Sequence, residues 1–114
     1  MSLHDKQSAQ LAAEHPRATE YRLFAEITRS LMAVGAADRS SAEFAGALDR
    51  NRVLWLTLRA DLESERNWLA DDLKAKLISL ALWVERHTDL VLASEAEVGP
   101  LIAVNRTIME GLAT

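Results

Sequence analysis

Residues 69–91 read LADDLKAKLISLALWVERHTDLV and carry the clearest periodicity in the chain. Apolar residues recur there at intervals of three and four, which predicts one face of an α-helix spanning about residues 69–93. Asp71 and Asp72 stand in its first turn, where the helix dipole favours negative charge. The stripe consists of Leu69, Leu73, Leu77, Leu80, Val84, His87 and Val91.

Other faces of the same segment are also apolar. They carry Ile78, Ala81, Leu82 and Trp83. A helix that is apolar nearly all round is either buried or engaged by a partner. We therefore expect this helix to be the central element of the fold.

Two helices are predicted before this segment. The first covers about residues 17–35, with Pro16 at its start and Gly35 at its end. The second opens at Ser40, because Glu43 follows three residues later and the pair resembles a capping box; it fades near Glu65. The core-facing residues of the first are Phe24, Ile27, Leu31 and Val34, and those of the second are Phe44, Leu48, Asn51, Trp55, Leu58 and Leu62.

A short closing helix follows the break at Gly99 and Pro100. Its apolar residues are Leu101, Val104, Ile108 and Leu112. No segment alternates with the period of two that a strand requires. The sequence therefore predicts a single all-α domain over residues 16–114, a bundle of four to five helices with short connections. Residues 1–15 form a separate N-terminal segment, helical or flexible.

Composition narrows the function classes. The chain has 114 residues, 13 Lys plus Arg, 17 Asp plus Glu, a net charge of −4 and no cysteine. Without cysteine there is no disulfide framework, thiol nucleophile or cysteine-ligated metal. The N-terminus lacks the pattern of a signal peptide, and no apolar run approaches the roughly twenty residues of a membrane span. We expect a cytoplasmic protein that does not contact a membrane.

The sequence lacks the residue motifs that are typical of enzyme active sites. His4, His15 and His87 do not share the i, i+4 spacing that brings two metal ligands onto one helix face. No phosphate-binding loop or nucleophile elbow occurs. We expect no catalytic residue, no metal and no cofactor, and interpret His87 as a boundary residue bonded to a carbonyl or to solvent.

Arg52, Arg59 and Arg66 recur every seven residues and could line one side of a helix. Such a row can neutralise phosphates and so bind RNA. Asp49 and Glu63 lie three or four residues from members of the row, which also allows pairing within the helix. The acidic balance and the lack of interleaved aromatic residues disfavour direct nucleic-acid binding.

Trp68 stands at the start of a helix, beside Asn67. Its ring can either cover the junction between helices or anchor a protein interface, where tryptophan is enriched. Trp55 and Trp83 are expected in the core between the second and third helices. Asn51, Asn67 and Asn105 are interpreted as structural residues, because amides fix helix register or cap helix ends.

Four ordered segments resemble the FlaF flagellar biosynthesis regulators of alphaproteobacteria. Residues 47–55 (ALDRNRVLW) resemble the family pattern A-L-x-x-N-x-x-L-W, and residues 67–69 (NWL) follow after Asp61 and Leu62. Residues 72–84 (DLKAKLISLALWV) and residues 102–112 (IAVNRTIMEGL) resemble two further family helices. The resemblance covers roughly residues 17–112.

The resemblance implies a non-enzymatic factor that promotes flagellin synthesis and secretion. Its implied partners are flagellin and an FlbT-like regulator of flagellin translation. The hypothesis for the contact surface comprises Trp68 and Leu69, with whichever of Ile78, Leu82 and Trp83 the bundle leaves uncovered. One alternative is direct binding of flagellin mRNA through the arginine row; another is an adaptor that only sequesters another regulator. Spare apolar faces would serve self-association equally well.

Overall fold

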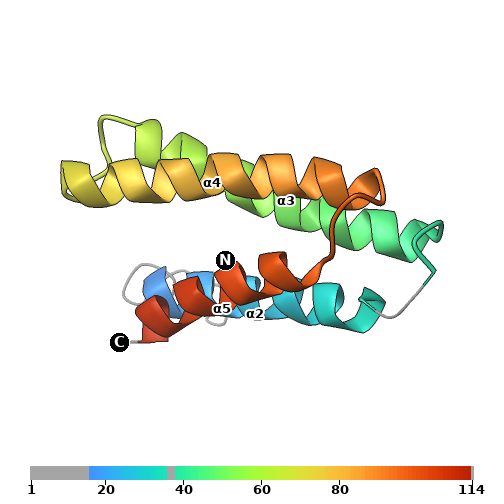
Figure 1. Cartoon of the computed structure of the whole chain (residues 1–114). Coiled ribbons are helices and arrows are strands. Elements are labelled where there is room, and N and C mark those ends of the chain that lie inside the picture. Colours follow the sequence, from blue (N-terminus) through green and yellow to red (C-terminus); the bar gives the residue numbers. More distant parts are fainter. Residues whose placement is uncertain (1–15, 36–37, 114) are drawn as a thin grey trace, which may run out of the picture.

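The computed structural model describes residues 16–35 and 38–113, which form four α-helices (Figure 1). Helix α2 spans Pro16–Val34, α3 spans Ala42–Glu63, α4 spans Asp71–Leu92 and α5 spans Gly99–Ala113. No described residue belongs to a strand. The prediction of a single all-α domain is confirmed. The expectation for residues 1–15 falls outside the described residues.

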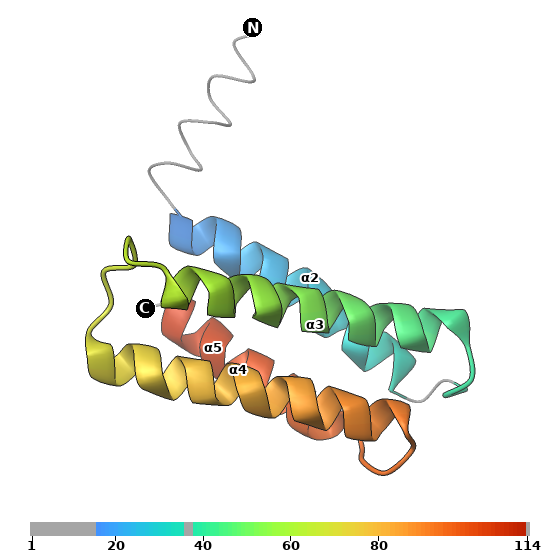
Figure 2. The same cartoon turned by 90° about the horizontal axis from the view of Figure 1, so that it is seen from above.

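The helices form two layers of two. Helices α3 and α4 run antiparallel in one layer, and α2 and α5 run antiparallel in the other (Figures 1 and 2). The layers meet mainly where α2 packs against α3, while α4 and α5 have the least contact of any neighbouring pair. Helix α4 therefore depends on α3 as its main packing partner.

Helix α3 is the central element. It lies between α4 and α2 and supplies Phe44, Ala47, Leu48, Asn51, Leu54, Trp55 and Leu62 to the interior. The buried residues of α4 are Ala81, Val84, Thr88 and Val91, which lie between its middle and its end. The expectation that the helix over 69–93 would be central is wrong. Its periodicity is the clearest in the chain, but periodicity does not say how many neighbours a helix has.

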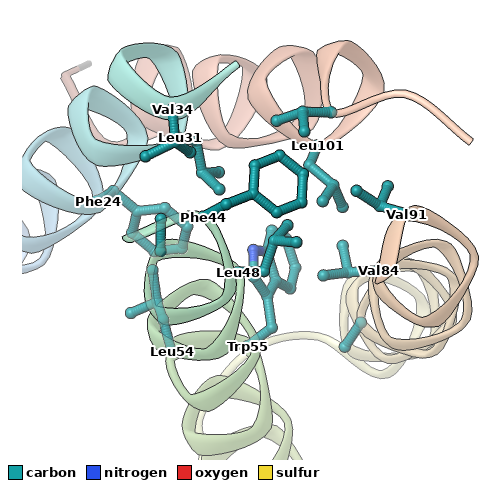
Figure 3. Close-up of a cluster of buried hydrophobic side chains, with 13 residues drawn as sticks. Phe24, Leu31, Val34, Phe44, Leu48, Leu54, Trp55, Val84, Val91 and Leu101 are labelled. Carbon is teal, nitrogen blue, oxygen red and sulfur yellow. The ribbon is translucent and has the colours of Figure 1, made fainter. Parts of the chain in front are cut away.

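The core fills the space between the two layers (Figure 3). Phe24 of α2 meets Trp55 of α3 edge to face, with ring centroids 5.8 Å apart and planes at 88°. This is the arrangement that aromatic quadrupoles favour. Phe44 and Leu101 complete the centre from α3 and α5, and both are fully buried.

The N-cap of helix α3 is Ser41, not the predicted Ser40. The Ser41 hydroxyl oxygen accepts the backbone N–H of Phe44 at 3.1 Å and so caps the first turn. The Ser40 side chain instead donates to Asp38 Oδ1 at 2.8 Å. These bonds hold the pKa of Asp38 below its usual value, chiefly through the backbone N–H of Ser40 and then through its hydroxyl. The capping-box prediction was wrong because the i, i+3 spacing exists in the sequence without the bond.

The ends of α4 differ from each other. At the start, the N-cap is Ala70, which has no side chain that can cap the helix; Leu69 precedes it and so lies outside the helix that the sequence predicted to include it. At the end, Ser94 adopts a positive φ of 61°. The Ser94 N–H donates to Val91 O at 3.0 Å and the Glu95 N–H donates to Leu90 O at 2.8 Å. This pair of bonds is the Schellman motif, which a glycine usually closes.

A buried polar network joins three helices. Asn105 of α5 donates through Nδ2 to Asn51 Oδ1 of α3 at 2.8 Å and to Thr28 Oγ1 of α2 at 3.1 Å. Its Oδ1 accepts the indole N–H of Trp55 at 2.9 Å. Asn51 Nδ2 is buried and has no hydrogen-bond partner among the described residues. The network therefore joins Asn51, Trp55 and Asn105 inside the bundle.

Candidate protein-binding surface

Trp68 is 97% exposed, although it is the largest type of side chain in the protein. It stands in the loop between α3 and α4, at the end of the bundle where α2 begins and α5 ends (Figures 1 and 2). Its indole N–H has no partner among the described residues. Of the two readings for Trp68, the structure excludes cover of the helix junction and leaves the ring free to contact another molecule.

Hydrogen bonds order the loop that carries Trp68. The Asn67 side chain donates to Asp61 Oδ2 at 3.0 Å and accepts the N–H of Leu69 at 3.0 Å. The backbone N–H of Asn67 donates to Ser64 O at 3.1 Å. Asn67 thus forms hydrogen bonds on both sides of Trp68 in the sequence and with the last turn of α3. Trp68 therefore projects from a loop whose backbone is held by hydrogen bonds.

The exposed apolar surface continues from the loop into α4. Leu69 is 40% and Leu73 is 44% exposed, and no residue of α4 before Ala81 is buried. We call Trp68, Leu69 and Leu73 together the Trp68 surface. Sequence reasoning missed the exposure of Leu73, because it has the same helical phase as the fully buried Val84. No signal in the stripe distinguishes the two positions.

The remaining candidates lie on two different sides of α4. Ile78 and Leu82 are one turn apart and share a face, with Leu82 exposed and Ile78 half-buried. At about 100° per residue, Trp83 is turned roughly 140° from Ile78 around the helix axis. Its half-buried ring stacks on His87, with centroids 4.8 Å apart. The structure thus does not gather the five candidates into one patch.

Two of the three arginines in the row form ion pairs between α3 and α4. Arg52 contacts Asp49 at 3.1 Å and Asp89 at 3.5 Å. Arg59 contacts Glu63 at 3.2 Å and Glu85 at 3.4 Å. Arg66 lies beyond the end of α3 with an exposed side chain. Two arginines of the row are therefore neutralised on α3, and the third lies in the following loop.

A shallow depression lies between α3 and α4 beside these ion pairs. It is lined by Arg52, Trp55, Leu56, Arg59, Ala81, Val84 and Glu85. Its charged side chains already face each other across the helices, as the Arg59 to Glu85 contact shows. The depression offers no unpaired charged group with which to recognise a polar ligand.

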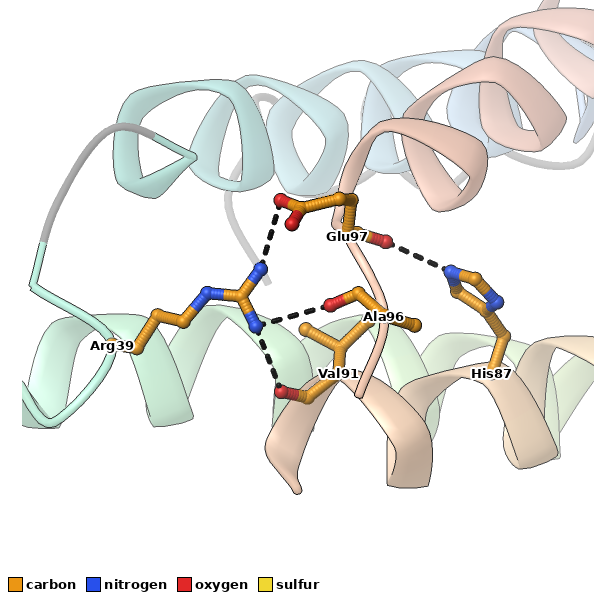
Figure 4. Close-up of polar contacts among 5 residues, drawn as sticks. All are labelled: Arg39, His87, Val91, Ala96 and Glu97. Carbon is orange, nitrogen blue, oxygen red and sulfur yellow. Dashed lines mark hydrogen bonds and ion pairs between the residues drawn. The ribbon is translucent and has the colours of Figure 1, made fainter. Parts of the chain in front are cut away.

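At the opposite end of α4, polar contacts tie two loops together (Figure 4). Arg39, before α3, donates to Ala96 O at 3.0 Å and to Glu97 Oε2 at 2.9 Å. His87 Nε2 lies 2.8 Å from Glu97 O, and because a carbonyl only accepts, this nitrogen carries the proton. The interpretation of His87 as a boundary residue bonded to a carbonyl is confirmed.

Within the described residues, no group of three or more His, Asp or Glu side chains is arranged to hold a metal ion. No helix in the described part of the chain has the length and hydropathy needed to cross a membrane.

Fold and surface together define a class: a small helical bundle whose most conspicuous feature is an exposed apolar contact surface. The model of the flagellar protein FlaF family matches residues 4–112, so the chain belongs to this family. No curated protein sequence and no solved structure matches the chain significantly. The resemblance noted in the sequence is confirmed, and the chain is a flagellar protein.

Proposed function

We propose that the chain is a non-catalytic, cytoplasmic regulator of flagellum biogenesis that binds flagellin through the Trp68 surface and thereby promotes flagellin synthesis or secretion. The observation that carries this proposal is the 97% exposure of Trp68 on a hydrogen-bonded loop. Large aromatic side chains dominate the energetics of protein interfaces, and tryptophan is the most enriched of them. An exposed tryptophan on a braced loop is suited to fill a pocket on a partner.

Leu69 and Leu73 support the same proposal. They extend the apolar surface from the loop along the first turn of α4, where α4 has no buried residue of its own. An exposed stretch of helix can receive a second amphipathic helix laid along it, which is a common mode of peptide recognition. A helical end of flagellin fits that geometry.

The binding experiment compares purified flagellin with a purified FlbT-like regulator by isothermal titration calorimetry. We expect flagellin to bind, and the Trp68→Ala variant to weaken that binding by about thirtyfold or more, the effect of losing an interface hot spot. Leu73→Ala should also weaken it.

Leu90→Ala is the matched control. Leu90 is in the same helix, is 43% exposed against 44% for Leu73, and lies near the opposite end of α4. Its substitution should leave the affinity unchanged. Unchanged flagellin binding by both Trp68→Ala and Leu73→Ala would refute the proposal. If the chain bound the FlbT-like regulator and not flagellin, the regulator would be the partner and the proposal for flagellin would be refuted.

Salt dependence separates this proposal from direct mRNA binding. Apolar docking should change little between low and moderate salt, whereas contacts with several phosphates weaken steeply. Arg52 and Arg59 are already paired with Asp89 and Glu85, which disfavours the RNA alternative. Tight, steeply salt-dependent binding of flagellin mRNA that is lost on Arg52→Gln and Arg59→Gln would favour it instead.

A further inference from the structure

In the loop between α3 and α4, hydrogen bonds of Asn67 span Trp68 and attach the loop to α3. Asn67 Oδ1 accepts the N–H of Leu69 at 3.0 Å, so one side chain spans the residue that lies between them. Asn67 Nδ2 donates to Asp61 Oδ2 at 3.0 Å, which attaches this span to the last turn of α3. Trp68 itself contributes no side-chain bond to the loop.

Further hydrogen bonds join the residues before Trp68 to the end of α3. The N–H of Ser64 donates to Asp61 O at 3.1 Å, and the N–H of Asn67 donates to Ser64 O at 3.1 Å. The N–H of Arg66 donates to Ser64 Oγ at 3.2 Å. These bonds run from the end of α3 to Asn67, and none of them buries the indole. The loop thus fixes the backbone on both sides of Trp68, although the indole itself is 97% exposed.

From this arrangement we infer that Asn67 is a positioning residue, which fixes the loop backbone at Trp68 so that the indole projects away from the bundle before a partner binds. The inference deepens the proposed function and rests on it for the partner, a helical apolar segment of flagellin. Association must otherwise order each mobile side chain and loop at the interface, and fixing the bound orientation in advance removes that cost. Asn67 would contribute to affinity without touching the partner.

The first test uses the free protein. The order parameter of the Trp68 backbone N–H, measured by 15N relaxation, should be near the value of about 0.85 typical of rigid backbone. In Asn67→Ala it should fall below about 0.6. A low order parameter in the unaltered chain, or one that Asn67→Ala leaves unchanged, overturns the inference whether or not flagellin binds.

The second test measures flagellin affinity. Asn67→Ala should weaken binding by about three- to tenfold, the cost of ordering one or two side chains. An unchanged affinity overturns the inference. If the unaltered chain fails to bind flagellin, the proposed function falls, and the order parameter alone then decides whether Asn67 holds Trp68.

An exchange of donor and acceptor separates positioning from a general effect on stability. Asn67→Asp keeps the acceptor for the Leu69 N–H but places a carboxylate against Asp61, so it should loosen Trp68 and weaken binding. Combining it with Asp61→Asn restores a donor and acceptor pair with the same total charge. The double variant should recover both the order parameter and the affinity, whereas failure to recover either one contradicts the role of this bond.

Discussion

The side-chain carbonyl of Asn105 on α5 accepts the indole N–H of Trp55 on α3 at 2.9 Å, across fifty residues of sequence. Both side chains are buried, and the amide of Asn105 also donates to Asn51 and Thr28. One residue therefore fixes α5 against α3 and α2 at the same point. A fully paired amide in the interior specifies one packing of the bundle, because any other register would leave buried polar groups without partners.

Asn105→Leu should lower the free energy of unfolding by about 2–4 kcal/mol, because it leaves the indole N–H of Trp55 and the side-chain oxygen of Asn51 buried without this partner. Urea denaturation measures the change. Thr107→Val on the same helix is the control, since among the described residues that exposed hydroxyl bonds only to Ala103 O within α5; it should change stability by less than about 0.5 kcal/mol. A stable Asn105→Leu variant would show that the network contributes no stability.

The same substitution, Leu→Ala, at Leu73 and at Leu101 compares the free-energy cost at an exposed and at a buried position. Leu101 is fully buried and Leu73 is 44% exposed. Leu101→Ala should cost about 2–5 kcal/mol, because it leaves a cavity in the core. Leu73→Ala should cost less than about 1 kcal/mol. Equal losses in chemical denaturation would mean that the first half of α4 is packed in solution.

Ser94→Gly should raise stability by about 0.5–1 kcal/mol. Ser94 has a φ of 61°, a conformation that disfavours residues with a Cβ, and glycine is the usual residue at this place in a Schellman motif. Thermal unfolding should show a midpoint higher by about 2–6 °C. Ser94→Ala retains the Cβ and should give no increase. A lower midpoint for Ser94→Gly would show that unfolded-state entropy outweighs the relief.

Arg39→Lys should loosen the loop between α4 and α5. The guanidinium reaches both Ala96 O and the Glu97 carboxylate, a fork that a single ammonium group cannot reproduce. We expect faster hydrogen exchange in residues 93–98 and a loss of about 1 kcal/mol, modest because the side chain is partly exposed. The control is Arg86→Lys, at an exposed position with no ion pair among the described residues. Equal exchange in both variants would contradict the clamp.

The ion pair between Arg59 and Glu85 should be weak. A double-mutant cycle with Arg59→Ala and Glu85→Ala should give a coupling below about 1 kcal/mol, because both groups are partly exposed and 3.4 Å apart. Salt should reduce the coupling further. A large coupling that does not respond to salt would indicate a pair shielded from water.

Sequence reasoning recovered most of the bundle because each helix carries its own evidence. The phase of Phe44, Leu48 and Trp55 follows from the period of α3, and Gly35 marks the end of α2 without tertiary context. Pro100 was expected in a break before the last helix, but it lies in the first turn of α5, where a missing N–H costs nothing. The cap of α3 was misplaced by one residue, since Ser40 and Ser41 differ only in which hydroxyl reaches a backbone N–H. The partners of Asn51 and Asn105 were beyond reach, because hydrogen bonds across fifty-four residues leave no local pattern.

The sequence by itself determined the class of fold, the places of four helices and the family, because helical periodicity and ordered motifs are properties of neighbouring residues. Only the tertiary structure decided which apolar positions are buried. Leu73 and Val84 share one stripe, yet α4 packs into the core at Val84 and not at Leu73. The physical reason is that an apolar stripe in the sequence indicates which face of a helix is apolar. Burial of that face requires a neighbouring helix that covers it.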